Sequence, residues 1–340
     1  MNSRQRKGCV GAVVVVFLLA ALAVMSGLLY WRWGSEAFGG AAHVVRITVT
    51  PGAALAAVGK DLKERGLIRS PLVFGLLGRG MILQPGAYDV SAAETPRRLL
   101  RRLAEGDVAT VKVTFPEGFT VEKIARRLKD RGVITDESTF LTLVTQKGNT
   151  LRASFPPPAN LEGYLFPDTY SFPIGATEKE VAQQMLSLFD RLVAKGKADD
   201  IKRSKHSLAE IVTIASLIER EAETDEDRPK IAGVIYNRLA RNQRLEIDAT
   251  VQYARKEHKS RLLYRDLEVD SPYNTYRHSG LPPGAIANPG LSSIEAALHP
   301  EKSPYLYYVA GPDGKSHIFG RTFAEHTANI AKVRRLRRGS

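Results

Sequence analysis

An uncharged stretch near the N-terminus most constrains what this chain can fold into. Val10 to Trp31 spans 22 positions without a charged residue. In a helix, which rises ~1.5 Å per residue, that length crosses a hydrocarbon core of ~30 Å. Three basic residues precede the stretch and one follows it closely: Arg4, Arg6, Lys7 and Arg32. The positive-inside rule therefore predicts a single-pass anchor within residues 1–35 in the inner (cytoplasmic) membrane, with residues 32–340 on its periplasmic or extracytoplasmic side.

The flanks of this stretch leave one alternative to a membrane anchor. Residues 21–23 (Ala-Leu-Ala) have the small-residue pattern of a signal-peptide cleavage site, so the segment could be removed after export. The apolar run nevertheless continues past this point to Tyr30, Trp31 and Trp33, which have the positions of an interfacial aromatic belt. This continuation favours a retained anchor.

The composition is that of a globular protein with an excess of basic residues. Of the 340 residues 44% are apolar, which suffices for two domains, and the formal net charge is +13. Residues 44–134 contain 16 Lys and Arg against 9 Asp and Glu. Such surfaces fit anionic lipid, an acidic polymer or nucleic acid, or are simply solvated. Because no zinc-finger, RNP or bZIP pattern is present, nucleic acid is not expected as a partner.

An internal repeat organises residues 44–150. Two segments, 47–68 and 113–134, match in these pairs: Gly52 and Gly118, Leu62 and Leu128, Gly66 and Gly132. Each copy predicts a short strand, a glycine turn, and a helix that ends at a left-handed glycine. Two further helix starts, Ser70-Pro71 and Thr95-Pro96, combine a capping residue with proline at the first helical position.

The repeated strand–helix unit resembles the LysM-like modules that bind glycan chains. The alternative is that it serves only as a spacer and folding scaffold, and the sequence leaves both open. Residues 155–160 are rich in proline and form a stiff connection. A second domain is therefore predicted over residues 160–335.

This second domain is predicted to be mainly helical, with one β-hairpin. Helices are expected near residues 178–195, 207–222, 229–241 and 249–257. Residues 306–310 and 316–319 flank a Gly-Pro-Asp-Gly turn, which is typical of a hairpin. Residues 271–290 are irregular, rich in Pro and Gly, and too long for a simple connection, so a functional loop is expected there. With the anchor and the repeat region, the chain is predicted to have an α+β fold.

Glu219 is the first candidate for catalysis. It follows the apolar run Ile211–Ile218 of a helix that Ser207 and Glu210 begin with a capping box. A carboxyl at the end of a buried helix loses solvation, so its pKa rises and it can act as a general acid. The alternative is that Glu219 only begins the polar exit of the helix, because further charged residues follow at once.

The chain resembles the YceG-like family of endolytic murein transglycosylases, single-pass membrane proteins that cut peptidoglycan strands. The most specific segments are Tyr273–Tyr276 (Tyr-Asn-Thr-Tyr) and Gly280–Gly284 (Gly-Leu-Pro-Pro-Gly). Further segments follow the family's order: Leu161–Tyr170, Ala215–Glu221, Val234–Leu239, Leu245–Tyr253 and Ala296–Pro300. The family's catalytic glutamate falls on Glu219, and the anchor with the repeated module matches the family's N-terminal half.

The resemblance implies cleavage of the MurNAc–GlcNAc bond within glycan strands, with formation of a 1,6-anhydro-MurNAc end that terminates or trims nascent strands. Glu219 would protonate the glycosidic oxygen and then accept the proton of the sugar's own C6 hydroxyl. The positive charge that develops on the sugar ring requires oxygen dipoles. The candidate substrate-binding residues are Asn274, Thr275, Tyr276 and Asn288 in the long loop, with Tyr236 and Asn237 beside it.

Two alternatives to this function stay open. Asp168 or Asp248 could supply a second carboxylate and make the protein a muramidase, a hydrolase, although a turn and a helix cap explain these residues as well. The protein could also be a non-catalytic, membrane-anchored peptidoglycan-binding scaffold of the cell-wall synthesis machinery, and the family implies cell-wall synthases as partners. Cys9 is the only cysteine, and the histidines show no metal-ligand spacing, so neither a metal nor a cofactor is expected.

Overall fold

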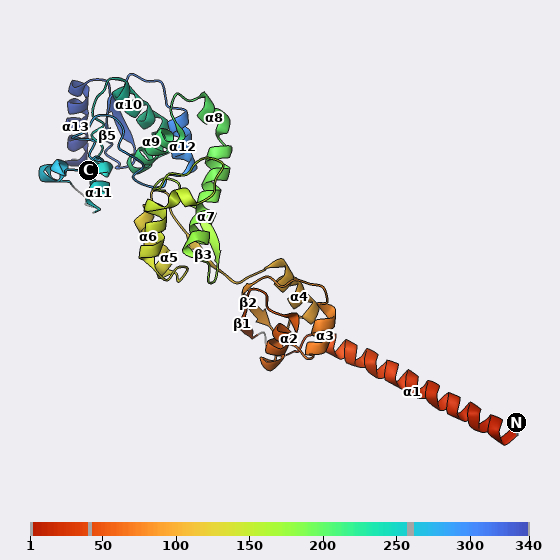
Figure 1. Ribbon diagram of the computed structural model, residues 1–340. Helices are drawn as coiled ribbons and strands as arrows, with labels where there is room; N and C mark the ends of the chain where they lie inside the picture. The colour runs from red at the N-terminus through yellow and green to blue at the C-terminus, as the bar shows by residue number, and fades with distance from the viewer. Residues whose placement is uncertain (1–2, 40–42, 257–261, 339–340) are drawn as a thin grey trace. The chain divides into compact units, whose positions relative to one another are not determined.

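The computed structural model describes residues 3–39, 43–256 and 262–338. The chain forms two compact units (Figure 1). The first contains the residues up to Val111 together with Pro173–Gly175, and the second contains Lys112–Phe172 and the residues from Ala176 onward. The division falls inside the predicted region 44–150, because the second copy of the repeat packs with the C-terminal residues.

The N-terminal apolar stretch forms one long helix, α1 (Ser3–Ser35). Its segment Val13–Ser35 has a mean hydropathy of 2.6, and its most apolar part is not buried in the protein. By length and composition this helix could cross a membrane, a property that signal sequences share. Tyr30 Oη and Ser70 Oγ lie 2.8 Å apart, so the end of α1 contacts the residue that precedes α3 (Pro71–Leu77) in the same unit.

The first unit builds one core from two strands and three helices. Its elements are β1 (Val44–Val49), α2 (Leu55–Glu64), α3 (Pro71–Leu77), β2 (Gly86–Ser91) and α4 (Pro96–Glu105). The strands are antiparallel, with Ile47 opposite Tyr88. All five elements contribute to the core, as in Ile47, Leu62, Phe74, Tyr88 and Leu99. The predicted caps are confirmed, because the side chains of Ser70 and Thr95 accept hydrogen bonds from the first turns of α3 and α4.

Both copies of the repeat form a strand, a glycine turn and a helix. In the second copy these are β3 (Thr110–Thr114) and α5 (Val121–Asp130), and β3 pairs with β4 (Thr169–Pro173). The predicted left-handed glycines are confirmed, with φ of +73° and +75° in the turns and +68° and +67° after the helices: Gly52, Gly118, Gly66 and Gly132. A LysM-like, glycan-binding character does not follow from these elements and stays a prediction.

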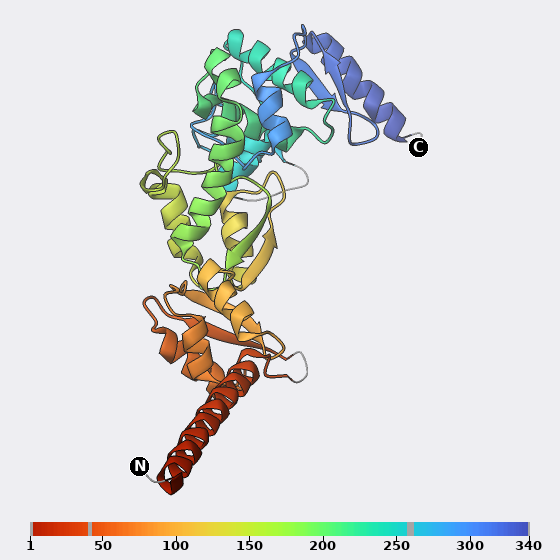
Figure 2. The same ribbon diagram turned by 90° about the vertical axis from the view of Figure 1, so that its right-hand side faces the viewer.

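The second unit is mainly helical. Its remaining helices are α6 (Glu137–Gln146), α7 (Glu178–Phe189), α8 (Ala198–Arg203), α9 (Leu208–Glu221), α10 (Arg228–Ala240), α11 (Asp248–Arg255), α12 (Leu291–Leu298) and α13 (Phe323–Arg338). The predicted hairpin is confirmed as the antiparallel pair β5 (Tyr307–Ala310) and β6 (His317–Gly320). It packs against α13, as Figures 1 and 2 show. Mixed helices and small sheets confirm the α+β class.

Helix α9 lies in the core of the second unit, as its apolar run predicts. Every residue from Ile211 to Ile218 is buried, and α9 contacts α10, α11 and α12. The predicted capping box is present: Ser207 Oγ accepts from Glu210 N at 3.3 Å, and Glu210 Oε2 accepts from Ser207 N at 2.8 Å. The capping box therefore fixes the start of α9. The position of the charged side chains in its last turn follows from that start.

Candidate active site

The last turn of α9 presents two carboxyls. Glu219 and Glu221 are two residues apart, so their side chains leave the helix roughly 200° apart at ~100° per residue. Both residues are partly exposed, yet burial by the surrounding protein raises the pKa of each. Only Glu219 is predicted from the sequence to be catalytic. The two carboxyls differ in the residues that they contact.

Glu219 lies at the N-terminus of α12. Its Oε2 accepts hydrogen bonds from Ser293 Oγ at 2.7 Å and from Gly290 N at 3.1 Å. Gly290 is the N-cap of α12 and has no side chain to cap the helix itself. Burial raises the pKa of Glu219, while the hydrogen bonds from Ser293 and Gly290 lower it. Glu219 therefore caps α12 with an acceptor oxygen, while burial outweighs the two hydrogen bonds and keeps its pKa above the ordinary value.

The glycine turn of the second repeat lies against Glu219. A Cβ at Gly118 would stand 3.7 Å from Glu219 Cγ, and a Cβ at Gly290 would overlap the carboxyl of Glu117. The nearby charge of Glu117 also raises the pKa of Glu219. Two backbone hydrogen bonds of 2.9 and 2.8 Å join this turn to Asn288. The end of the exposed Glu117 side chain thus lies directly against Gly290.

Glu221 has the properties of a general acid. Its Oε2 accepts a hydrogen bond from Tyr308 Oη at 3.0 Å. Burial raises the pKa of Glu221 to about 7, against the lowering effect of the Tyr308 hydrogen bond, and the charge of Asp248 adds to the increase. A carboxyl with a pKa near the working pH both donates and accepts a proton readily.

Tyr276, a predicted substrate-binding residue, lies on the Glu221 side of α9. Its Oη donates to Asp248 Oδ1 at 2.6 Å, and burial, then Asp248, then Glu221 raise the pKa of Tyr276. Asp248 is not the helix cap that the sequence predicts, because Ile247 holds the N-cap position of α11. Two acids and two phenols from four chain segments thus form what we term the Glu221 cluster: Glu221, Asp248, Tyr276 and Tyr308.

Asn274 and Thr275 shape the long loop from within. Both are buried. Asn274 Nδ2 donates to two backbone carbonyls at 2.8 Å each, and its Oδ1 accepts from Tyr276 N at 3.0 Å. Thr275 Oγ1 accepts from Ile247 N at 3.0 Å. These contacts hold Tyr276 beside the start of α11.

Asn288 uses its whole side-chain amide inside the protein. The residue is fully buried. Its Oδ1 accepts from Gly163 N at 3.0 Å and Leu165 N at 2.9 Å, and its Nδ2 donates to Phe119 O and Glu162 Oε1, both at 2.9 Å. Both donors and both acceptor positions of the amide are therefore occupied. Asn288 joins three distant segments of the second unit.

Tyr236 and Asn237 fasten α10 to the segment after α12. Tyr236 Oη donates to Ala297 O at 2.7 Å, and Asn237 Nδ2 donates to Ser303 O at 2.7 Å and Tyr305 O at 2.9 Å. Of the six predicted substrate-binding residues, the structure brings Tyr276 alone into the Glu221 cluster. The other five hold the surrounding segments together.

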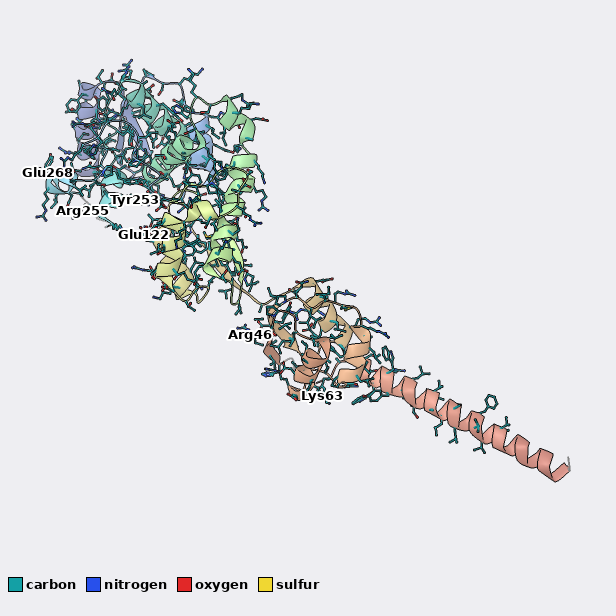
Figure 3. All side chains as sticks on the ribbon, in the orientation of Figure 1. Arg46, Lys63, Glu122, Tyr253, Arg255 and Glu268 are labelled. Atoms are coloured by element: carbon teal, nitrogen blue, oxygen red, sulfur yellow. The ribbon has the colours of Figure 1, made fainter. Side chains whose placement is uncertain are left out.

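The motifs do not single out Glu162, a buried carboxyl beneath the site. Both of its oxygens lie 3.2 Å from Val121 N, and Tyr253 Oη donates to Oε2 at 3.4 Å. Burial, and then the charge of Glu122, raise the pKa of Glu162 well above its usual range. Tyr253 of α11 and Glu122 of α5, labelled in Figure 3, belong to its surroundings. The only signal in the sequence is a single acid inside the otherwise uncharged run 161–166.

The acidic side chains of the two units are not arranged as metal ligands. Within the ranges that the structure describes, no group of three or more His, Cys, Asp and Glu side chains could hold a metal ion. The most buried histidine contact pairs His317 Nδ1 with Asp227 Oδ2 at 3.0 Å. It joins β6 to the start of α10.

Comparisons with known proteins agree with the sequence motifs. The model of the YceG-like family matches residues 47–332. The endolytic murein transglycosylase of Bacillus subtilis (strain 168) is 37% identical over 310 residues, which are 83% of this chain and 82% of the relative. The endolytic murein transglycosylase of Streptococcus pneumoniae serotype 2 (strain D39 / NCTC 7466) is 29% identical over 320 residues, which are 85% of this chain and 58% of that longer relative.

A solved structure extends the similarity to the fold. The crystal structure of a yceG-like protein from Listeria monocytogenes superposes with a TM-score of 0.58 at 35% sequence identity. The match covers 85% of this chain and 99% of that chain. The predicted resemblance is confirmed: the chain belongs to the YceG-like family.

Proposed function

We propose that this protein is an endolytic murein transglycosylase, which cleaves glycan strands of peptidoglycan. Its relatives from Bacillus subtilis and Streptococcus pneumoniae carry that name. The observation that carries the proposal is the environment of Glu219, the residue on which the family's catalytic glutamate falls. This carboxyl stands at the end of the buried helix α9, accepts hydrogen bonds from Ser293 and Gly290, and has a pKa that burial raises above its ordinary value.

In the proposed reaction Glu219 acts first as an acid and then as a base. Its proton moves to the oxygen that joins MurNAc to GlcNAc, and the bond between that oxygen and C1 of MurNAc breaks. The C6 hydroxyl of the same MurNAc bonds to C1 and gives its proton to the Glu219 carboxylate. The 1,6-anhydro ring closes and the acid is restored. Both reacting atoms belong to one sugar, which supplies a high effective concentration without a bound water.

The Glu221 cluster would bind the sugar and stabilise the charge that develops on its ring. The carboxylate of Asp248 is oriented by the Tyr276 hydroxyl at 2.6 Å. Preorganised dipoles and charges stabilise an oxocarbenium-like transition state without reorganisation. Tyr276 is therefore proposed to position Asp248, and Tyr308 to orient Glu221.

Glu221 is the second candidate for the catalytic acid. Burial raises its pKa to about 7, and its carboxyl accepts a hydrogen bond from Tyr308. The contacts of Glu219 are fixed in turn, because Arg228 Nε donates to the same Ser293 hydroxyl at 3.2 Å.

The N-terminal half is proposed to hold the enzyme at its substrate. Helix α1 would be a single-pass anchor in the inner membrane, because Val13–Ser35 is long and apolar enough and basic residues precede it. Both units would then lie on the extracytoplasmic side, where peptidoglycan is. Binding of glycan by the LysM-like repeat and contact with cell-wall synthases are further parts of this proposal.

Digestion of purified glycan strands separates the candidate functions. The protein is expected to release strands with 1,6-anhydro ends, which are lighter by one water than hydrolysed ends. Glu219→Gln is expected to slow cleavage by about 10²–10⁴-fold, the range for loss of a general acid. Glu221→Gln is expected to retain much more of the rate, and Glu223→Gln, an exposed neighbour, all of it.

Three other outcomes would overturn parts of this proposal. If Glu221→Gln abolishes cleavage in a folded protein and Glu219→Gln does not, the acid is Glu221. Ends that carry the added water would assign a muramidase, with Asp248 or Asp168 as second carboxylate. Strands that are bound but not cut by the unaltered protein would indicate a scaffold.

A further inference from the structure

The first unit has an exposed apolar surface close to the end of α1. Four large side chains of α3 and the turn after it are exposed: Leu72 by 61%, Leu76 by 51%, Met81 by 44% and Ile82 by 79%. Leu72 and Leu76 are one helical turn apart and so share one face of α3. We term these four residues the α3 patch. Contiguous exposed apolar groups of this kind mark interaction surfaces.

Basic side chains border the α3 patch. Arg97 and Arg101 of α4 line one recess of ≈510 Å³ together with Met81 and one carboxylate, Glu105. Both arginines are exposed, and no ion pair joins either of them to a carboxylate among the described residues. Arg102, by contrast, pairs with two carboxylates at 2.9 and 2.7 Å. The recess therefore combines an apolar wall with two guanidinium groups free to bind an anion.

Direct contacts fix α3 to the end of α1. Ser70, the cap of α3, lies 2.8 Å from the Tyr30 hydroxyl. The Arg69 guanidinium stands 5.9 Å from the centre of the Trp33 ring. Figure 1 shows α3 on the side of the first unit from which α1 projects. The α3 patch thus adjoins the aromatic residues that would lie in the membrane interface.

We infer that the α3 patch docks on the outer surface of an anionic lipid bilayer. Its apolar side chains enter the boundary between headgroups and acyl chains, and Arg97 and Arg101 bind lipid phosphates. The inference rests on the anchoring of α1 proposed above, since α1 brings the patch to the membrane. It assigns to the first unit a lipid partner in addition to any glycan that it binds.

Depth measurements on the full-length protein in lipid nanodiscs test this docking. Cys9 is replaced by serine, and single cysteines at Leu72 and Ile82 carry nitroxide labels. A label at Thr48, exposed on β1 on the opposite side of the unit in Figure 1, is the control. In nanodiscs with phosphatidylglycerol, power saturation is expected to give a several-fold higher ratio of oxygen to nickel-chelate accessibility at 72 and 82 than at 48.

Charge variants test the lipid phosphates as the ligand. Arg97→Gln and Arg101→Gln are each expected to lower the ratio of docked to undocked protein about five-fold, which corresponds to ~1 kcal/mol per basic side chain at an anionic surface. Purely zwitterionic nanodiscs should act like the double variant, and Lys60→Gln, exposed on α2, should change nothing.

The same labels give the outcomes that would overturn the inference. Equal access of water-soluble nickel to positions 72, 82 and 48 would exclude docking. Labels shielded in native membranes but not in nanodiscs would assign the α3 patch to a membrane-protein partner instead. A chain that does not enter nanodiscs at all would refute the anchor itself, which is a distinct failure.

Discussion

Asn288 Nδ2 donates a 2.9 Å hydrogen bond to Glu162 Oε1, although 126 residues separate the two in the sequence. The same amide binds the backbone of Gly163, Leu165 and Phe119. One side chain thus ties the long loop to the turn of the second repeat. That turn carries the Glu117 carboxyl, which faces Glu219 across Gly290.

Asn288→Ala is expected to lower the free energy of unfolding by about 3 kcal/mol, because it leaves several buried polar groups without partners. Denaturant unfolding at fixed pH measures the change. Asn149→Ala, at an exposed position, is the matched control and is expected to stay within ~0.5 kcal/mol of the unaltered protein. Equal stability of the two variants would show that the Asn288 hydrogen bonds contribute nothing net.

The pH dependence of cleavage reports the proton on Glu219. Burial raises the pKa of Glu219, and a general acid works only while protonated, so kcat/KM is expected to fall about tenfold per pH unit above that raised pKa. Initial rates on purified strands from acidic to alkaline pH measure this limb. A rate that does not fall at alkaline pH would contradict Glu219 as the acid.

Ser293→Ala is expected to move that alkaline limb to higher pH. The Ser293 hydroxyl donates to Glu219 and lowers its pKa, so without it the neutral acid persists further. Ser292→Ala, at the exposed position before it, is the control and should leave the limb in place. A Ser293 variant with lower activity but an unmoved limb would reduce the role of Ser293 to packing.

Gly290→Ala is expected to displace the Glu117 carboxyl, because the new methyl group overlaps it. Glu117 is exposed, so its side chain moves aside and the loss of stability is expected to stay below ~1 kcal/mol. In the Glu117→Ala background the same change should cost still less, which a double-mutant cycle measures. Additive losses would mean that the two residues do not meet.

Protonation of Glu221 also links stability to pH. Its pKa is about 7 in the folded protein against an ordinary 4.5, so the fold binds this proton more tightly than the unfolded chain does. The stabilisation is complete below about pH 4.5 and is lost as the pH rises through about 7. Glu221→Gln should therefore be more stable than the unaltered protein by about 2 kcal/mol near pH 8, and not near pH 5. A stability difference that is independent of pH would contradict the raised pKa.

Local signals in the sequence predicted most elements correctly. The Ser207–Glu210 capping box began α9, and Gly66 and Gly132 ended the repeated helices with the expected left-handed φ. These features depend on residues within one or two turns of each other. Short-range chemistry is therefore sufficient to predict them.

The surroundings of the two carboxyls depend on contacts between residues that are far apart in the sequence, which no local sequence pattern predicts. Glu219 and Glu221 share one helical turn, and what distinguishes them is Ser293 on one side and Tyr308 on the other, more than 70 residues downstream. Asn274 and Asn288 are polar residues of a loop rich in Pro and Gly, a pattern that predicts substrate contacts, and both amides point inward and bind backbone groups. Which side chains a loop buries is decided by its packing, not by its composition.

Helix α9 ends at Glu221, so this carboxyl stands where the backbone carbonyls of the last turn have no helical partners. The negative end of the helix macrodipole repels a carboxylate there and accepts a neutral acid. The helix backbone thus adds to the factors that favour the neutral form of Glu221, and no side-chain substitution can remove this contribution. A cation would suit the same position better, and the fold keeps an acid there at the expense of its own stability.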